Sequence, residues 1–243
     1  MKIEANLTHF KELNQMVREC PDKDIVIDNC IGQRYIASGL ANKNITINGT
    51  PGNALGAYLD GCRIVLNGNA QEATGDTMND GTIVIHGSCG DGTGYAMRGG
   101  KIFIHGNSGY RTGIHMKAFK EKFPVIVIGG SAGSFLGEYQ AGGVIIVLGM
   151  NTNEEHLAGY FCGTGMHGGK MFFRCDEDKL PPNLPPQVDS SVATAEDLAE
   201  IEQYIDEYCK EFGENKEEIL NHKFYVLKPD TKNPYKQLYT YSF

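Results

Sequence analysis

The chain has 243 residues, with 22 Lys and Arg against 30 Asp and Glu, which gives a formal charge of −8. This acidic balance argues against a nucleic-acid-binding surface, which needs a basic patch. No apolar run approaches the roughly 18 residues of a membrane helix and the amino terminus has no signal-peptide core, so we expect a cytoplasmic location. The seven cysteines form no Cys-x-x-Cys pair, and we expect reduced thiols packed as small hydrophobic side chains.

The first expected element is a short cap over residues 1–24. Thr8 stands where a helix N-cap is favoured, and apolar residues from Phe10 to Val17 follow at helical spacing. Residues 25–44 then read as an imperfect first repeat with an alternating apolar strand. Terminal repeats are expected to be atypical. The cap is therefore expected to seal the open end of the repeats.

From residue 45 an eight-residue glycine phrase returns every 19 residues, and each copy follows a short apolar strand. The first copies begin at Gly49, Gly68, Gly87 and Gly106. A fixed period of this length indicates a solenoid, and stacked coils of a parallel β-helix explain why the same corner needs glycine in each coil. A five-residue insertion at Lys117–Pro124 lengthens one repeat, and we expect it to protrude as a basic, partly aromatic loop.

The strand residues sort into faces because alternate side chains point to opposite sides. Two aliphatic columns that begin at Ile45 and Ile47 are predicted to form the core. The column between them is expected to point outward and is apolar nearly throughout: Thr46, Val65, Val84, Phe103, Val127 and Ile146. An exposed apolar stripe of this length is unusual, so we expect the carboxy-terminal segment or another protein to cover it.

The last repeat and the tail depart from the period. Residues Asn151–Gly165 are predicted to form a protruding loop before a closing strand at Lys170–Arg174. A proline-rich linker follows Cys175, then a helix that opens at Thr194 and ends at Gly213, a short helix over Lys216–Leu220, and a strand over Phe224–Pro229. We therefore divide the chain into a cap (1–24), a repeat domain (25–176) and a linker with a helical tail (177–243).

Three features suggest chemistry, and each has a structural alternative. Gly90-Asp-Gly92-Thr-Gly94 looks like a phosphate loop, but a strand rather than a helix is expected to follow it. His86 and His105 share a column in neighbouring coils and could hold a metal together, although stacked polar side chains are commoner. Glu154, Glu155 and His156 pair acids with a base, yet a solvated loop is favoured.

No residue is predicted to be catalytic, cofactor-binding or metal-binding. Cys62 and Cys162 occupy equivalent coil positions, but the coils that separate them exclude a disulfide. The sequence therefore indicates a scaffold. Function is expected where the 19-residue period is interrupted, at the Lys117–Pro124 insertion and the Asn151–Gly165 loop.

The glycine phrases, especially Gly87–Gly94 and Asn107–Lys117, resemble the GXGXG-motif domain. That family includes the carboxy-terminal domain of the glutamate synthase large subunit and a structural subunit of formylmethanofuran dehydrogenase. The resemblance implies a right-handed parallel β-helix, here of about seven coils with a short amino-terminal cap and an α-helical tail. It also implies a domain that carries no catalytic residue and holds catalytic domains in place.

By this resemblance the chain is expected to be a non-catalytic scaffold subunit of a glutamate synthase-like oxidoreductase complex in nitrogen metabolism. The expected partners are amidotransferase and FMN-binding synthase subunits, with FMN and iron–sulfur clusters in those partners and no cofactor in this chain. Association of this chain with further copies of itself is a further possibility. The alternatives are a scaffold like the structural subunit of formylmethanofuran dehydrogenase, in one-carbon metabolism, and an independent enzyme that uses His86, His105 or the Glu154–His156 loop.

Overall fold

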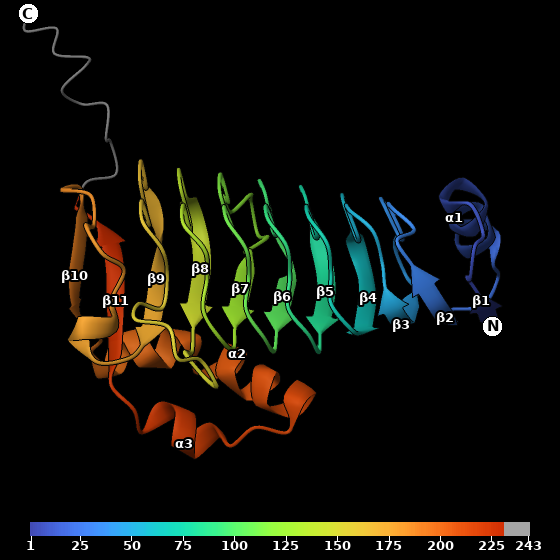
Figure 1. Cartoon of the computed structure of the whole chain (residues 1–243). Helices are drawn as coiled ribbons and strands as arrows, with labels where there is room; N and C mark the ends of the chain where they lie inside the picture. The colour runs from blue at the N-terminus through green and yellow to red at the C-terminus, as the bar shows by residue number, and fades with distance from the viewer. Residues whose placement is uncertain (231–243) are drawn as a thin grey trace, which may run out of the picture.

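The computed structural model describes residues 1–230 of the chain. One sheet of 11 strands runs through the described residues in the order β1-β2-β3-β4-β5-β6-β7-β8-β9-β11-β10. Figure 1 shows the strands side by side in a row. Their bounds are β1 Lys2–Glu4, β2 Asp24–Ile31, β3 Asn44–Thr50, β4 Asp60–Asn67, β5 Asp80–Ile85, β6 Lys101–Ile104, β7 Val125–Ile128, β8 Ala141–Val147, β9 Gly168–Arg174, β10 Val188–Val192 and β11 Phe224–Pro229.

The prediction of a right-handed parallel β-helix, a solenoid of about seven coils, is wrong. The regular strands belong to a single mixed sheet, which is parallel from β1 to β9 and antiparallel where β11 pairs with β9 and β10. The second half of each repeat is a run of turns that forms no further regular strand; neighbouring turns are linked by backbone hydrogen bonds and by isolated bridges such as Ala70↔Cys89. These turns contain left-handed residues, for example Ala54 (φ 63°) and Tyr58 (φ 57°), which break the extended backbone that further sheets need.

The 19-residue period keeps the parallel strands in step. Ile45 pairs with Ile64, Ile64 with Ile83 and Ile83 with Ile102. These side chains are all buried on one face, where they meet the turn layer in the main core. Leu59 and a column of methionines from the turns complete that core: Met78, Met97, Met116 and Met166. The prediction of two inward aliphatic columns is confirmed.

Two different physical requirements explain why glycine recurs in the phrase. Gly75 takes a left-handed backbone (φ 68°), as a corner requires. Gly68 has an ordinary φ, but any side chain there would strike the backbone carbonyl of Gly49 in the preceding repeat. Only part of the glycine pattern therefore reflects corner geometry, and the rest reflects the close approach of successive repeats.

Side chains complete the hydrogen bonds of the turns. Asn69 accepts from the backbone N–H of Ser88 at 2.8 Å, and Asn107 accepts from that of Ser131 at 2.9 Å. Thr74, Thr93 and Thr112 are fully buried at equivalent positions of successive repeats, and Thr93 donates to the carbonyl of Gly90 at 3.0 Å. A polar side chain in one repeat thus fixes the backbone of its own or the next repeat, because buried backbone groups need partners.

A helix closes the amino-terminal end, as predicted. α1 spans Phe10–Glu19 and buries Leu13 and Val17 in the main core. Its N-cap is His9 rather than Thr8, and the His9 ring accepts from the Lys11 N–H at 3.4 Å.

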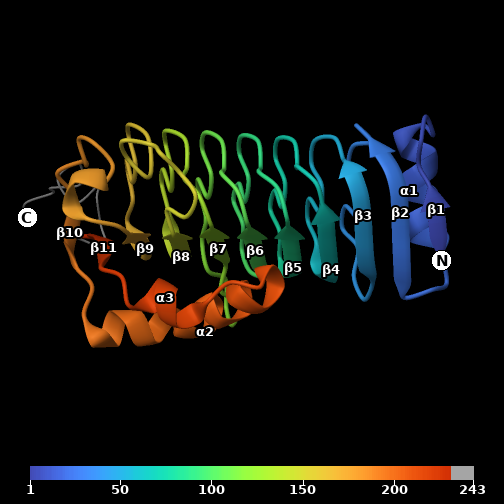
Figure 2. The same cartoon turned by 60° about the horizontal axis from the view of Figure 1, so that its bottom comes forward.

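The tail folds back along the sheet. α2 (Ala195–Phe212) has Thr194 as its N-cap and Gly213 as its left-handed C-cap (φ 73°), and α3 (Lys216–Leu220) and β11 follow. The predicted positions of these three elements are confirmed. A short 3-10 turn at Glu177–Lys179 precedes β10. Figure 2 shows α2 and α3 along one side of the row of strands.

Candidate functional site

The outer face of the sheet is the surface on which α2 lies. Ile201, Ile205 and Tyr208 of the helix are fully buried against it. The cluster includes the apolar column of the sheet: Val84, Phe103, Val127, Ile146 and Phe172. Figures 1 and 2 both show α2 running beside the strands from the β9 end toward β5. Of the two expected covers for this column, the carboxy-terminal segment is confirmed from Val84 to Ile146, whereas Val65 is only partly buried against the cluster and Thr46 lies outside it.

Ion pairs along α2 fix its direction on the sheet. Arg63, Lys101 and Lys170 occupy one cross-strand column. They pair with Glu211, Glu207 and Glu200, each at 2.6 Å. The three acids lie on one helix face because they are four and seven residues apart. Each exposed pair contributes little stability, but together they set which way the helix runs.

Asp197 joins the start of α2 to two strands. Its carboxylate accepts from Lys228 Nζ of β11 at 2.6 Å and from the Thr194 hydroxyl at 2.9 Å, with Lys170 Nζ of β9 at 3.4 Å. Burial raises the pKa of this carboxyl, but the hydrogen bonds from Lys228 and Thr194 outweigh it and hold the pKa well below its ordinary value. The charged form of Asp197 is therefore stabilised by the folded chain.

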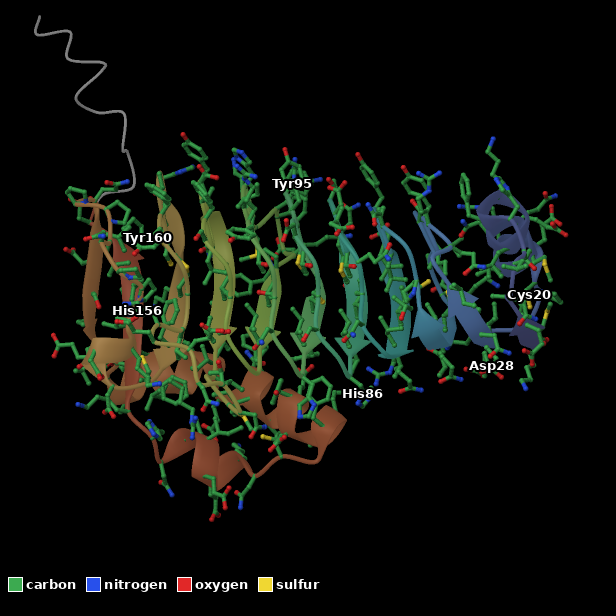
Figure 3. The ribbon with its side chains drawn as sticks, viewed as in Figure 1. Cys20, Asp28, His86, Tyr95, His156 and Tyr160 are labelled. Carbon is green, nitrogen blue, oxygen red and sulfur yellow. The ribbon has the colours of Figure 1, made fainter. Side chains whose placement is uncertain are left out.

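His86 and His105 lie under the other end of α2. The Phe212 ring stacks on His105, with ring centroids 4.8 Å apart, and meets His86 edge-on at 5.2 Å. His105 Nε2 lies 3.0 Å from Glu214 Oε1. Figure 3 places His86 beside the helix. Both histidines thus contact the end of α2, and no group of three His, Cys, Asp or Glu in residues 1–230 is placed to hold a metal ion.

The glycine phrase Gly90–Gly94 forms part of a turn that leads through Tyr95 and Arg98 into strand β6. A phosphate loop needs a helix whose N-terminus faces the ligand. The segment that follows here is a strand, as the sequence predicts, so this phrase has the geometry of a repeat corner.

All seven cysteines are buried free thiols, so the expectation of reduced thiols is confirmed. Cys62 and Cys162 are accordingly unpaired. Burial raises the pKa of the Cys89 thiol to about 12. This thiol is therefore protonated and unreactive at neutral pH.

The Asn151–Gly165 loop forms one wall of a cleft of about 600 Å³. Glu154, Glu155, His156 and Tyr160 of the loop line it, together with Tyr110 of an earlier turn. Figure 3 shows His156 and Tyr160 in the same part of the molecule, near the β9 end. The two glutamates are exposed, and Nδ1 of His156 is buried without a hydrogen-bond partner in residues 1–230. The cleft therefore joins acidic and aromatic side chains.

The Lys117–Pro124 insertion forms a small turn closed by two backbone hydrogen bonds between Phe119 and Lys122. Phe119 and Phe123 are exposed, as predicted for a basic, aromatic protrusion. Lys122 pairs with Asp60 at 2.7 Å, and the turn borders a shallow pocket of about 460 Å³ beside Tyr204 of α2. The insertion thus leans toward the helix side of the sheet.

The family model described as the GXGXG motif matches residues 23–230. The chain belongs to the GXGXG motif family. The match includes the tail through β11, so the helix and the last strands are part of what the family model covers.

Two individual proteins are similar to this GXGXG chain. The uncharacterized protein MJ1350 of Methanocaldococcus jannaschii is 47% identical, over 98% of this chain and 95% of its own length. A chain in the crystal structure of the formyltransferase/hydrolase complex of Methylorubrum extorquens, solved with methylofuran, shares the fold with a TM-score of 0.68. The alignment covers 87% of this chain and 75% of that one at 22% identity, which indicates a common fold.

Two features of the GXGXG chain are not recognisable from its sequence pattern. The Arg63–Lys101–Lys170 column is hidden because its strands are separated by up to 107 positions of chain and its partners lie on α2. The exposed rings of the turn layer are hidden because their positions do not alternate. The sequence offers one signal for them, since Tyr110 and Tyr160 each directly follow a glycine, Gly109 or Gly159. No helix within residues 1–230 has the length and apolar character needed to cross a bilayer.

Proposed function

We propose that this chain is a non-catalytic structural subunit of a multi-subunit complex of the formyltransferase/hydrolase type. One observation carries the proposal: large rings stack along the exposed edge of the turn layer. Phe135 and Phe161 stack with centroids 4.9 Å apart, and His115 and Tyr139 stack at 5.2 Å. Tyr160 and Phe161 are 57% and 55% exposed. A patch of exposed rings beside charged residues has the composition of a protein–protein contact.

The rest of the molecule suits a rigid support. The inner face of the sheet packs on the turns and the outer face packs under α2, so both sheet faces are used for folding over much of their length. Backbone hydrogen bonds link each turn to the next, as in Ala54 to Glu72 and Ala73 to Asp91, both at 2.8 Å. The turn edge is then a long, fixed surface, and we assign the chemistry and its cofactors to the partner subunits.

The choice of complex is supported by the fold shared with a chain of the formyltransferase/hydrolase complex. A glutamate synthase-like complex is the second candidate. It is favoured by the combination of a helix with the Phe224–Pro229 strand, which resembles the end of the glutamate synthase domain. In that case the partners are amidotransferase and FMN-binding synthase subunits, and FMN and iron–sulfur clusters belong to those partners.

Purification of the tagged chain from its native host tests this proposal. We expect stoichiometric recovery of formyltransferase- and hydrolase-type subunits, identified by mass spectrometry. Recovery of amidotransferase and flavin-containing subunits, with a flavin absorbance spectrum, selects the second candidate. Recovery of the chain alone under gentle conditions, or an activity of the purified chain alone, overturns the scaffold assignment.

A further inference from the structure

One column of the turn layer has two exposed rings with a gap between them. Backbone hydrogen bonds fix this column, because Gly92 donates to Tyr110, Arg111 donates to Ser134 and Phe135 donates to Tyr160, at 2.8 to 2.9 Å. Tyr110, Ser134 and Tyr160 are thus consecutive members of one ladder, and the middle member has no ring. Tyr110 and Tyr160 are 53% and 57% exposed, and all three line the cleft of about 600 Å³.

The spacing of the repeats leaves room above Ser134 for about one ring. Neighbouring repeats lie about 4.8 Å apart, and in the adjacent column Phe135 and Phe161 stack at 4.9 Å. Tyr110 and Tyr160 are two repeats apart, roughly 9.6 Å by the same spacing. A planar group above Ser134 therefore lies at the ordinary spacing of this ladder from each tyrosine, in the offset-stacked range of aromatic pairs.

The wall of the cleft adds a charge preference. Glu154 and Glu155 line it and are exposed. Their carboxylates form no ion pair within residues 1–230, and Lys179 donates instead to the backbone carbonyl of Glu154 at 3.2 Å. A positive group beside the inserted ring is therefore favoured, since two like charges at one rim attract a cation.

We propose that the gap above Ser134 binds an aromatic side chain of a partner protein that is flanked by Lys or Arg. The ring stacks between Tyr110 and Tyr160, and the flanking cation faces Glu154 and Glu155. This inference rests on the proposed function, because it names the contact through which a partner subunit is held. The cleft is open, which suits a protruding segment of another chain.

The chain contains no Trp, so the emission of a Trp probe peptide reports binding without background. The probes are Gly-Lys-Trp-Arg-Gly amide and Gly-Glu-Trp-Glu-Gly amide, titrated with the full chain. We expect the basic probe to bind at least about tenfold more tightly than the acidic one. Equal affinity of the two probes overturns the charge preference and with it the proposal.

Three variants locate the binding. Ser134→Tyr supplies the missing ring from the chain itself and is expected to weaken the basic probe about tenfold. Asn53→Tyr is the matched control, because Asn53 occupies the same column, where its carbonyl accepts from Tyr35 at 3.0 Å; its affinity is expected to equal that of the wild type. Glu154→Gln/Glu155→Gln is expected to abolish discrimination between the probes. Unchanged affinity in Ser134→Tyr, with circular dichroism showing the fold intact, overturns the proposal.

Two further outcomes are informative. If removal of residues 231–243 raises probe affinity tenfold or more, the chain's own carboxy terminus is the occupant and the partner assignment fails. In the native host, loss of one subunit from tagged Ser134→Tyr but not from Asn53→Tyr supports the contact. If Ser134→Tyr retains every subunit, the contact is refuted while the scaffold function stands, whereas wild-type chain recovered alone refutes the scaffold function.

Discussion

Single residues in the turns carry unusual backbone angles. Ala54, Ala73, Arg111, Phe135 and Phe161 all have φ between 58° and 64°. A left-handed backbone costs an L-residue roughly 1–2 kcal/mol. Each of these side chains in the turn layer therefore carries a backbone energy cost. Gly92, which occupies the same column, avoids that cost because it is glycine.

Because of this strain, we expect Ala73→Gly to stabilise the folded chain, whereas an ordinary Ala→Gly change destabilises it. Ala73 has φ 58°, so glycine relieves the strain, and the free energy of unfolding is expected to rise by about 0.5–1 kcal/mol. Ala57, which is buried and has no positive φ, is the control, and Ala57→Gly is expected to lower stability by a similar amount. Urea denaturation of both variants measures this. Destabilisation by both changes contradicts the strain argument.

Tyr208 of α2 is fully buried, and its hydroxyl has no hydrogen-bond partner in residues 1–230. Burial, with Glu214 nearby, raises the pKa of this phenol. Tyr208→Phe removes an unsatisfied polar atom and keeps the ring, so we expect stability to stay equal or to rise by about 1 kcal/mol. Tyr208→Ala is expected to cost about 3–5 kcal/mol, because it empties the core between helix and sheet. A large loss in Tyr208→Phe, measured by thermal unfolding, contradicts this account.

At the scale of elements, α2 is held by an apolar face, a row of ion pairs and one buried carboxylate. The apolar face contributes most, since exposed ion pairs contribute at most about 1 kcal/mol each. Asp197 differs because its side chain is only 8% exposed and it contacts both β9 and β11. The docking of α2 is therefore expected to depend on the charge of this residue.

Acid should weaken that docking in a defined direction. The pKa of Asp197 is lowered in the folded chain from an ordinary value of 3.8, so its stabilising effect is complete above about pH 5 and is lost as the pH falls below 4. Asp197→Asn is expected to cost about 2 kcal/mol at pH 7 and progressively less below pH 4. Chemical denaturation at pH 7, 4 and 3 measures the difference. Parallel stability curves for the two proteins contradict the assigned role.

At the scale of the whole molecule, the tail is part of the folded unit. β11 supplies the antiparallel neighbour of β9, and α2 covers Phe103, Val127 and Phe172. A chain that ends at residue 176 therefore exposes both an apolar face and a free strand edge. We expect it to aggregate in light scattering. A chain that ends at Asp230 keeps all the described contacts and is the control; a monodisperse 1–176 fragment contradicts self-coverage.

The sequence predicts much of this molecule because its period and its helix signals are local. The strand columns follow from the 19-residue interval, and α2 is predicted from Thr194, its apolar stripe and Gly213. The β-helix is mispredicted because a period of glycines does not reveal that Ala54 and Tyr58 turn the backbone left-handed. The Asp197–Lys228 contact is hidden because its members are 31 positions apart.

Much of the candidate contact surface could not be predicted from the sequence, again because its residues are far apart along the chain. The Asn151–Gly165 loop is noticed because it breaks the period, and it does line the cleft. Tyr110 and Ser134 lie within otherwise regular turns and Tyr160 lies in that late loop, and nothing in the local sequence marks Ser134 as a gap between two rings. Ser134 is recognised as a gap only when the residues that stack across repeats are known. The five-residue insertion and the late loop change the interval between those residues, so the sequence alone does not align them.

The row of ion pairs also relates the number of repeats in the sheet to the length of α2. Arg63, Lys101 and Lys170 must meet Glu211, Glu207 and Glu200, whose separations along α2 are fixed by its rise of about 1.5 Å per residue. A whole repeat gained or lost between Arg63 and Lys170 is therefore expected to break at least one of these pairs unless α2 changes as well. Before Arg63 no ion pair joins the sheet to α2 within residues 1–230, so growth or shortening of the molecule by entire repeats is expected at its amino-terminal end.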